Sequence, residues 1–537
     1  MTGSDQPAPV RGACFFGGQR LLPLVEAFTK EIAGARKAED IEHIHRMRVA
    51  SRRLRAALPL FRDCYPEKNF RFWTTEIRKI TRALGAARDA DVQIAFLKEY
   101  LQKQQEPILS HPEIMPVPTK PDHLSVKLVL SHLQIKRNNL QKDIFHALDE
   151  LEQRHVMDDI QIACQTVLPK HGRRHLRARM HGLPAVASAR IGKDLLRLFS
   201  YEPWVHNPDA IAEHHAMRIS AKKLRYTMEI YSPLYRWKLR KSLARIKKMQ
   251  ELLGDIHDCD VWIDHITLLV MKERNRPHTL HNRHLGKTYG IAPLRHLLIN
   301  REKRRQWLYR QFVRFWESLQ RSGFWNELQI TVIAGHKNAF CIHSDVPEFS
   351  ERQAIQRIAI RVPLLAEHCR SVTGLALRLF DELQDLHQLG VRDRVLLEYA
   401  ALLHDIGWTS EERGHQRRSA GMILAEEDLP LNVRERGILG LIIRSHGSKV
   451  KYMADGFFHL LLNDDQQRVM ALAALLRIAD GLDYLHQQTV TDLQCTFGTH
   501  EVFCNIVAKG DVTIEKRRAL TRGDLFTEVF GRDLVIQ

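Results

Sequence analysis

The sequence lacks several patterns that would assign a protein to a known class at once. Its eight cysteines include no Cys-x-x-Cys pair, which argues against a zinc finger and predicts free thiols in a reducing compartment. No apolar run is long enough to span a bilayer, and the first residues do not have the basic-then-apolar layout of a signal peptide. A glycine-rich phosphate loop and a ribonucleoprotein motif are also missing. We therefore expect a soluble cytoplasmic protein with no membrane partner.

Acidic residues are in short supply relative to basic ones. The 537 residues include 81 Lys and Arg but only 63 Asp and Glu, for a formal net charge of +18. Such an excess favours a polyanionic partner, which could be nucleic acid, polyphosphate or an anionic membrane face. A hydrophobic content of 44% is that of a globular protein, and the length allows more than one core. Charge alone does not choose among the three partners.

The most informative stretch of the sequence occurs twice. Glu42–Arg55 reads EHIHRMRVASRRLR, and Glu213–Arg225 reads EHHAMRISAKKLR. Each copy is followed at a similar distance by a second block, LGAARDADV at Leu84–Val92 and LGDIHDCDV at Leu253–Val261. This correspondence indicates an internal duplication, which predicts two similar helical units in the first half of the chain.

On a helix, the basic residues of each copy share one face. In the first copy they are His45, Arg48, Arg52 and Arg55, with Met47, Leu54 and Leu58 on the opposite face, and in the second copy they are His215, Arg218, Lys222 and Arg225, with Met217 and Leu224 opposite. Neighbouring like charges repel each other. One interpretation is a solvated basic face. The other is an anion-binding surface, because phosphates would relieve the repulsion and suit the arginine fork. The duplication favours the second.

The duplicated H-x-x-R-(x)3-[RK]-[RK]-x-R helix, with the later L-G-x-x-x-D-x-D-V block, resembles the conserved-histidine α-helical domain, or CHAD. The resemblance covers residues 15–330, as repeats of 15–165 and 166–330. It implies two pseudo-symmetric helical bundles facing each other across a basic groove that binds inorganic polyphosphate. The implied binding residues are His45, Arg48, Arg52, Arg53, Arg55, Arg78, Lys79 and Arg88 in the first half, and His215, Arg218, Lys222, Lys223, Arg225, Lys247 and Lys248 in the second.

The second block departs from the first at one basic position. His257 stands where the first copy has Arg88, which makes that half less cationic at neutral pH. The aspartates of the two blocks cannot bind phosphate directly. We expect them to orient the arginines or to cap a helix, in preference to a metal site; they are Asp89, Asp91, Asp258 and Asp260.

Other segments of the first half complete the expected layout. Residues 105–122 form a proline-rich linker, and 171–179 are a basic run that either extends the groove or ends a helix in solvent. A long helix over 293–320 closes the bundle, and a connector over 331–350 follows. We expect the aromatic face of the long helix to be core rather than a base-stacking platform; its members are Trp307, Phe312, Phe315 and Trp316.

The second half, residues 351–537, has a different pattern, in which histidines and aspartates lie on or beside apolar helices. They are His368, His404, Asp405, His415, His446 and Asp480. Imidazoles with carboxylates suit divalent cations, and such a set could hold two metals about 3.5–4 Å apart that share one carboxylate. The alternative is a set of degenerate helices that keep scattered histidines. Alternation from about residue 489 predicts a short β-hairpin, followed by a helix at LFTEVFG.

LLHDIGW, GHQRRSAG and LLRIADGLD resemble the HD phosphohydrolase superfamily, and within it the C-terminal domain of the exopolyphosphatase and guanosine pentaphosphatase family. The resemblance implies His368, His404, Asp405 and Asp480 as core ligands of one or two divalent metals (Mn, Mg, Fe or Zn), with His415 and His446 as additional ligands. It implies that His404 and Asp405 carry the catalysis, with Asp405 bridging. Relatives read GHHKHS where this chain reads GHQRRS, and the actin-like catalytic half is missing, so a binding appendage stays open.

Arginines near these ligands in sequence could stabilise developing negative charge or lie on the surface; they are Arg417, Arg418 and Arg444. We predict a mainly α protein in which duplicated helical bundles precede an α-helical HD domain with a small β-containing C-terminal segment. It is expected to bind inorganic polyphosphate, at polyphosphate granules, and to hydrolyse a phosphorylated small molecule or polyphosphate. A non-catalytic polyphosphate-targeting protein with a degenerate HD domain is the alternative, and nucleic-acid binding is a less favoured third. The oligomeric state is not predicted.

Overall fold

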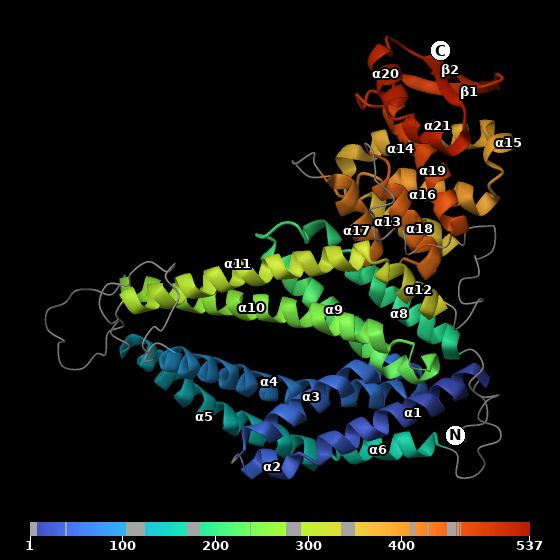
Figure 1. The fold of residues 1–537 in the computed structure, drawn as a ribbon. Helices are drawn as coiled ribbons and strands as arrows, with labels where there is room; N and C mark the ends of the chain where they lie inside the picture. The colour runs from blue at the N-terminus through green and yellow to red at the C-terminus, as the bar shows by residue number, and fades with distance from the viewer. Residues whose placement is uncertain are drawn as a thin grey trace. The chain divides into compact units, whose positions relative to one another are not determined.

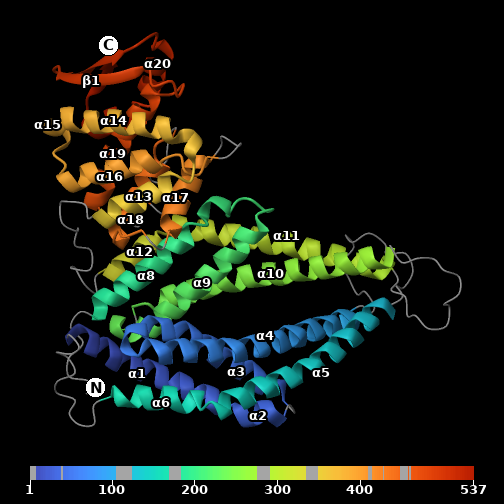
Figure 2. The same cartoon turned by 180° about the vertical axis from the view of Figure 1, so that it is seen from behind.

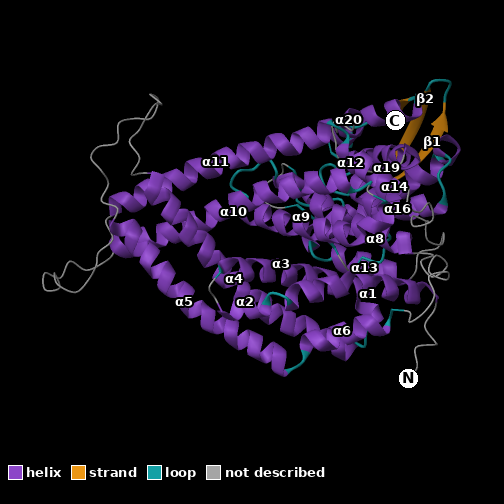
Figure 3. Cartoon of the chain, turned by 60° about the horizontal axis from the view of Figure 1, so that its bottom comes forward, coloured by secondary structure: helices purple, strands orange, loops and turns teal. Residues whose placement is uncertain are grey.

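The computed structural model is mainly helical, as predicted, and the strands of the described residues lie near the C-terminus (Figures 1 and 3). It describes residues 8–37, 40–103, 124–168, 183–236, 238–274, 291–333, 349–408, 414–426, 429–447, 458, 461 and 463–537. The predicted linker at 105–122, the basic run at 171–179 and most of the 331–350 connector lie outside these residues. None of the described helices is long and apolar enough to cross a membrane.

The chain is divided between two compact units, and it passes from one to the other several times. One unit comprises Met1–Pro184, Arg225–Pro233 and Glu251–Gln311, and the other comprises Ala185–Leu224, Leu234–Gln250 and Phe312–Gln537. This division by packing does not follow the order of the predicted segments along the chain. The boundaries at 330 and 351 therefore stay a prediction.

The first unit contains both helices of the first basic copy. Its described helices up to residue 168 are α1 (Ala8–Thr29), α2 (Ile32–Lys37), α3 (Ile41–Ala57), the 3-10 helix η1 (Leu58–Cys64), α4 (Glu67–Lys103), α5 (Leu124–Gln153) and α6 (Val156–Thr166). Asp40 caps α3 by accepting the Glu42 N–H at 2.8 Å. Met47 and Leu54 are fully buried on the apolar face of α3, as the spacing predicts. The amphipathic pattern therefore fixes which face of α3 carries the basic side chains.

Two equivalent ion pairs join long neighbouring helices, one between α4 and α5 and the other between α10 (Arg240–Arg274) and α11 (Ile291–Arg321). Asp91 of α4 accepts from Arg137 of α5 at 2.7 Å (Nε to Oδ1), and α4 and α5 run side by side in both ribbon views (Figures 1 and 2). Asp260 of α10 accepts from Arg305 of α11 through the same atoms. Each arginine is 12% exposed. The duplication seen in the sequence is therefore repeated in the packing.

Two of the cysteines are bonded, which corrects the prediction of free thiols. Cys14 of α1 and Cys64 at the end of η1 form a disulfide, with their Cα atoms 5.1 Å apart. The described free cysteines are Cys164, Cys259, Cys369, Cys495 and Cys504, all buried. No local pattern indicates this pair, because 50 residues separate the partners and the packing of α1 on η1 brings them together.

The aromatic face predicted on α11 is buried at some positions and exposed at others. Phe312 and Trp316 are fully buried, and the Trp316 ring lies 5.6 Å from Phe199 of α8 (Leu183–Phe199). Trp307, by contrast, is 45% exposed, so its assignment to the core is wrong. Nine residues at about 100° each place Trp307 on the face opposite Trp316.

The remaining elements of the second unit build the histidine- and aspartate-bearing region. The helices are η3 (Glu202–Trp204), α12 (Phe324–Ile333), α13 (Phe349–Ala359), η6 (Pro363–Leu365), α14 (Ala366–Glu382), α15 (Gln384–His387), α16 (Val391–Leu403), α17 (His415–Ala425), α18 (Val433–Arg444), α19 (Asn463–Leu482), α20 (Thr513–Thr521) and α21 (Asp524–Phe530). Helix α9 (Ile211–Tyr231) is shared by the two units, and the 3-10 helix η4 (Ser232–Tyr235) follows it.

A three-stranded sheet ends the chain, and its hairpin was predicted. β1 (Val490–Phe497) pairs antiparallel with β2 (Glu501–Ala508), and β3 (Asp533–Ile536) adds to β2 in parallel. α21 covers the LFTEVFG segment that was predicted to be helical. α20 and α21 both pack against α19, the helix that carries Asp480. The C-terminal segment therefore lies next to the candidate site.

Candidate metal centre and basic helix faces

The six predicted ligands come together in space although they are spread over about a hundred residues of sequence. They are His368 on α14, His404 and Asp405 directly after α16, His415 at the start of α17, His446 just after α18 and Asp480 on α19. His404 is fully buried, and His415 is partly exposed, with 20% of its side chain accessible. All five helices bring their residues to the site at or near a helix end.

One half of the cluster is formed by two histidines and two carboxylates. The Nε2 atoms of His368 and His404 lie 3.3 Å apart. Asp480 Oδ1 is 3.4 Å from His368 Nε2 and 3.8 Å from His404 Nε2. Asp405 Oδ2 completes the group at 3.7 Å from His404 Nε2 and 4.0 Å from His368 Nε2. Ligand atoms of these residues thus converge on one small volume.

The other half uses the second oxygen of the same aspartate. Asp405 Oδ1 lies 3.2 Å from His415 Nε2 and 3.5 Å from His446 Nε2, and these two nitrogens are 3.1 Å apart. Each oxygen of Asp405 therefore faces a different pair of histidines. This is the arrangement expected of a carboxylate shared between two ions.

Three of the histidines are held in the orientation that a ligand needs. His404 Nδ1 donates to the Ala401 carbonyl at 2.8 Å, and His446 Nδ1 donates to the Ile443 carbonyl at 2.6 Å. Because a carbonyl can only accept, the proton of each neutral ring sits on Nδ1 and Nε2 keeps its lone pair. His368 Nδ1 lies 2.8 Å from Asp483 Oδ2, the carboxylate–histidine contact common behind metal ligands. All three rings present Nε2 to the cluster.

The electrostatics of the cluster keep its carboxylates ionised. Burial acts to raise the pKa of Asp405, but His404, His415 and His446 outweigh it and lower the pKa well below its usual range. The pKa of Asp480 is also lowered, since Arg522 and His368 oppose the effect of burial.

The pKa values of the three buried histidines shift in different directions. Burial lowers the pKa of His446. For His404 and His368 burial acts in the same direction, but Asp405 beside His404, and Asp480 and Asp483 beside His368, raise each pKa to about 9. The cluster therefore carries a shared set of protons that a divalent cation would displace on binding.

The turn after Asp405 is fastened to α17, which places His415. The Gly407 N–H donates to Ser419 Oγ at 2.9 Å, and Arg418 Nε donates to the Gly407 carbonyl at 3.0 Å. A Cβ at position 407 would lie 2.4 Å from the Ser419 backbone nitrogen, closer than real contacts allow. Glycine is therefore needed here for the backbones to approach.

The arginines near the ligands in sequence make structural contacts. Arg418 binds the Gly407 carbonyl, and Arg444 pairs with Glu202 of η3 at 2.9 Å. Arg417 also helps to lower the pKa of Glu202, although burial opposes the shift. An ion pair with the cluster is made instead by Arg522, which follows α20 and donates to Asp480 Oδ2.

Sequence reasoning missed three residues at the site. Asp483 had a signal, because it follows Asp480 by three positions within the LLRIADGLD motif and lies directly after α19. No sequence pattern pointed to His486 or Arg522. The His486 ring stacks on His368 with the ring centroids 3.8 Å apart, and Arg522 donates to Asp480. Their contacts depend on the tertiary packing of the C-terminal segment.

The donor set fits a divalent metal. Among the described residues, two triads have ligand atoms within 4.8 Å of one another, and Asp405 Oδ1 is buried without a hydrogen-bond partner there. The mixture of imidazole nitrogen and carboxylate oxygen suits transition-type cations. The triads are His368, His404 and Asp480, and His404, Asp405 and His446.

The basic face of the first copy is formed by α3 with help from α4. Burial and the charges of Arg88, Arg48 and Arg52 lower the pKa of His45. The His45 Nδ1 and Arg52 Nε atoms are buried and have no hydrogen-bond partner among the described residues. Arg48 is held by Asp89 at 3.0 Å, the orienting role predicted for that aspartate. Arg55 and Arg78 are exposed.

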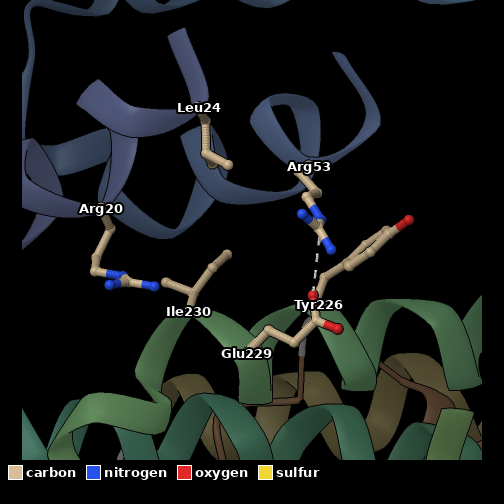
Figure 4. Close-up of a pocket in the computed structure, with 6 residues that line it drawn as sticks. All are labelled: Arg20, Leu24, Arg53, Tyr226, Glu229 and Ile230. Atoms are coloured by element: carbon tan, nitrogen blue, oxygen red, sulfur yellow. Dashed lines mark ion pairs between the residues drawn. The ribbon is translucent and has the colours of Figure 1, made fainter. Parts of the chain in front are cut away.

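Two other predicted residues of the first copy already have acidic partners. Lys79 pairs with Glu76 and Glu150, each at 3.2 Å, so its charge is balanced locally. Arg53 lies 4.0 Å from Glu229, beside a cavity of about 200 Å³ in the first unit (Figure 4). The cavity is lined by Arg20, Leu24, Arg53, Tyr226, Glu229 and Ile230.

The basic residues of the second copy lie on α9 and α10. Lys223 pairs with Asp194 at 3.3 Å, and Arg225 pairs with Glu229. Lys248 lies over the Phe315 ring, 4.7 Å from its centroid, and Lys247 is exposed. The others, His215, Arg218 and Lys222, are half-buried on α9. Several predicted cations are therefore partly neutralised before any ligand binds.

Comparison with known families agrees with the sequence resemblance. The family model of the CHAD domain matches residues 19–267. This match assigns residues 19–267, a little under half of the chain, to a CHAD domain. The crystal structure of the CHAD domain from the plant Ricinus communis is similar at 21% identity, covering 56% of this chain and 86% of that one, with a TM-score of 0.36. No curated protein matches the chain.

A second family model accounts for the region beyond the CHAD domain. Domain III of the Ppx/GppA phosphatases matches residues 351–529. The match includes all six clustered ligands and Arg522. The resemblances to the CHAD domain and to the C-terminal domain of the exopolyphosphatase and guanosine pentaphosphatase family are thus confirmed, and together they are consistent with a function related to polyphosphate.

Proposed function

We propose that this protein binds inorganic polyphosphate through the basic faces of its CHAD domain and hydrolyses a phosphoanhydride or phosphoester at a divalent-metal centre in its C-terminal domain. The observation that carries the proposal is the position of Asp405 between two histidine pairs, 3.2 to 4.0 Å from their Nε2 atoms. This arrangement is typical of the metal sites of HD phosphohydrolases, which the LLHDIGW motif resembles.

The residues of the site have separable tasks under this proposal. His368, His404 and Asp480 would hold one ion, His415 and His446 a second, and Asp405 both. Such ions, when bound, lower the pKa of water and polarise the phosphoryl group. Asp483 and the carbonyls of Ala401 and Ile443 keep the imidazoles turned toward the centre. Asp405 and Asp480, ionised throughout, offset the charge of the cations.

Polyphosphate binding is supported by two buried nitrogens of α3, His45 Nδ1 and Arg52 Nε, which have no hydrogen-bond partner among the described residues. Burial and the charge of the neighbouring Arg88 lower the pKa of His45. A chain of phosphates supplies acceptors and negative charge at once. With this ligand, we expect the protein at cytoplasmic polyphosphate stores.

A second candidate is a non-catalytic polyphosphate-targeting protein. It is supported by the match of residues 351–529 to domain III of the Ppx/GppA phosphatases. Here the histidine cluster would hold a structural ion or a proton network. Turnover separates the two candidates.

Metal content and phosphate release, measured on the same preparations, test the proposal. We expect the wild-type protein, reconstituted with Mn²⁺, Mg²⁺, Fe²⁺ or Zn²⁺, to hold up to two ions and to hydrolyse polyphosphate or a phosphorylated small molecule. Asp405→Ala should lose both the metal and the activity, because it removes the carboxylate that faces both histidine pairs. His415→Ala should lose one ion of two.

The control is Asp464→Ala, which removes an exposed aspartate from α19 and should change neither measurement. Polyphosphate binding should survive Asp405→Ala. A wild-type protein that takes up none of the four cations would contradict the metal centre, and a metal-loaded protein without turnover would favour the targeting function.

A further inference from the structure

Arg522 connects the C-terminal segment to the metal-ligand cluster. It follows α20 directly, and its Nη1 donates to Asp480 Oδ2. The other oxygen of Asp480 faces the histidines, at 3.4 Å from His368 Nε2 and 3.8 Å from His404 Nε2. The carboxylate is therefore divided, with one oxygen turned to the candidate metal position and the other to the arginine.

The guanidinium of Arg522 has donors to spare. A guanidinium carries five N–H groups on three nitrogens in a fixed fork. In Arg522, one of these nitrogens, Nη1, donates to Asp480. No other side-chain hydrogen bond of Arg522 is found in the described part of the chain. Its remaining contact is with the Tyr484 ring, 5.8 Å from the centroid, and 22% of the side chain is exposed. Free donors thus lie at the solvent side of a buried ligand.

Solvent also reaches the cluster at two of its histidines, His415 and His486. His415 is 20% exposed and His486 is exposed, whereas His368, His404 and His446 are buried. A ligand that reaches the cluster from solvent would therefore meet Arg522 and His415 rather than the buried histidines. The arginines closer in sequence are engaged elsewhere, Arg418 with Gly407 and Arg444 with Glu202.

We propose that Arg522 is a phosphoryl-binding residue of this site, which holds substrate oxygens through its free N–H groups while Nη1 stays on Asp480. The inference rests on the proposed function and adds the group that binds the substrate. Arginine suits the role, because its planar fork matches the oxygens of a phosphoryl group and its charge is permanent. Placed beside the ions, it would also stabilise the negative charge that develops during transfer.

Inorganic phosphate is the probe, titrated calorimetrically into the full chain with and without saturating Mn²⁺. The Mn²⁺-dependent component isolates this site from the basic faces of the CHAD domain. Arg522→Ala should weaken that component by about tenfold or more, as expected for loss of charge-assisted hydrogen bonds. Arg522→Lys, which keeps the charge but not the fork, should recover part of the loss.

Arg518→Ala is the matched control. Arg518 lies over the same Tyr484 ring, 4.3 Å from its centroid, and its loss should leave the Mn²⁺-dependent phosphate affinity unchanged. Equal phosphate affinity in Arg522→Ala and wild type at saturating Mn²⁺ would overturn the inference and leave the proposed function standing. Loss of Mn²⁺ itself from Arg522→Ala, with unchanged phosphate affinity once Mn²⁺ is restored, would also overturn it, since Arg522 would then only position Asp480. A wild-type protein without Mn²⁺ would overturn both.

Discussion

At the candidate centre, the structure determines which atom of each side chain faces the cluster. Asp405 presents each oxygen to a different histidine pair, and His404 and His446 present Nε2 because backbone carbonyls occupy Nδ1. Gly407 is equally specific, since any Cβ there would meet the Ser419 backbone at 2.4 Å. Small changes at these positions therefore displace ligand atoms without removing them.

His45 should make polyphosphate binding depend on pH. In the protein without ligand, burial and the charge of Arg88 lower the pKa of His45 below the usual 6.5 of histidine, so the ring is neutral at pH 7. A bound phosphate chain favours the charged ring. Binding should thus take up a proton, and affinity should rise as the pH falls through the pKa of the complex. The gain is complete only below the pKa of the free protein. Calorimetry in two buffers of different ionisation enthalpy measures the uptake.

His45→Gln should remove this proton uptake. His146→Gln is the control, because His146 is 79% exposed on α5 and not on the basic face of α3. Equal uptake by His45→Gln and wild type would mean that the ring at position 45 does not meet the polymer.

The sequence identified the side chains that cluster at the candidate site but not the residues that support them. His368, His404, Asp405, His415, His446 and Asp480 could be found, because each stands in a short motif beside an apolar helix pattern. Arg522, His486 and the Cys14–Cys64 pair could not, since their partners are distant in sequence and are brought near only by the packing of helices. Local patterns predict local geometry, and contacts between segments need the fold.

At the level of elements, a buried ion network joins three helices of the C-terminal domain. Arg392 of α16 is 4% exposed and donates to Glu351 of α13 and to Glu435 of α18, each at 2.8 Å. Both carboxylates are buried as well, and the Tyr399 hydroxyl lies 3.5 Å from Glu351. The network fixes α16, whose end carries His404 and Asp405.

Arg392→Met should therefore destabilise the protein by about 3–5 kcal/mol, because it leaves two buried carboxylates without a cation. Arg394→Met, two positions along α16, is the control: Arg394 pairs with Asp381 on the surface, where a salt bridge contributes about 1 kcal/mol or less. Urea unfolding of the two variants gives the comparison. Similar losses in both would contradict a special role for the buried network.

Helix periodicity predicted most elements and failed where two faces were merged. The stripe of α3 was predicted correctly because Met47 and Leu54 share one face, and both are buried. On α11 the prediction places all four aromatic residues on one apolar face, but Trp307 lies on the face opposite Trp316. Arg304 Cζ lies over the Trp307 ring, 4.5 Å from its centroid. A count of residues along the helix would have separated the two.

For the whole molecule, we expect polyphosphate affinity to fall linearly on a log–log plot against salt concentration, as counterion release requires. Arg48→Glu should weaken binding strongly, because it reverses a charge beside His45 and Arg88. Arg517→Glu makes the same change at an exposed position on α20 and should have little effect. Filter binding or anisotropy across a salt series measures both variants.

A competition experiment tests whether the protein, with its net charge of +18, binds polyphosphate in preference to other polyanions. Duplex DNA at equal phosphate concentration should displace the polymer poorly, because a stiff helix cannot follow closely spaced side chains on α3. One-for-one displacement would favour general nucleic-acid binding.

The repeated aspartate–arginine pairs also bear on how the chain arose. Asp91 with Arg137 and Asp260 with Arg305 join two helices through the same atoms and at the same depth. Independent acquisition of both contacts would require two matching sets of mutations, whereas one gene doubling explains them together. The pair is therefore older than the duplication, and an ancestor with a single copy of the repeat already joined its two long helices through one such ion pair.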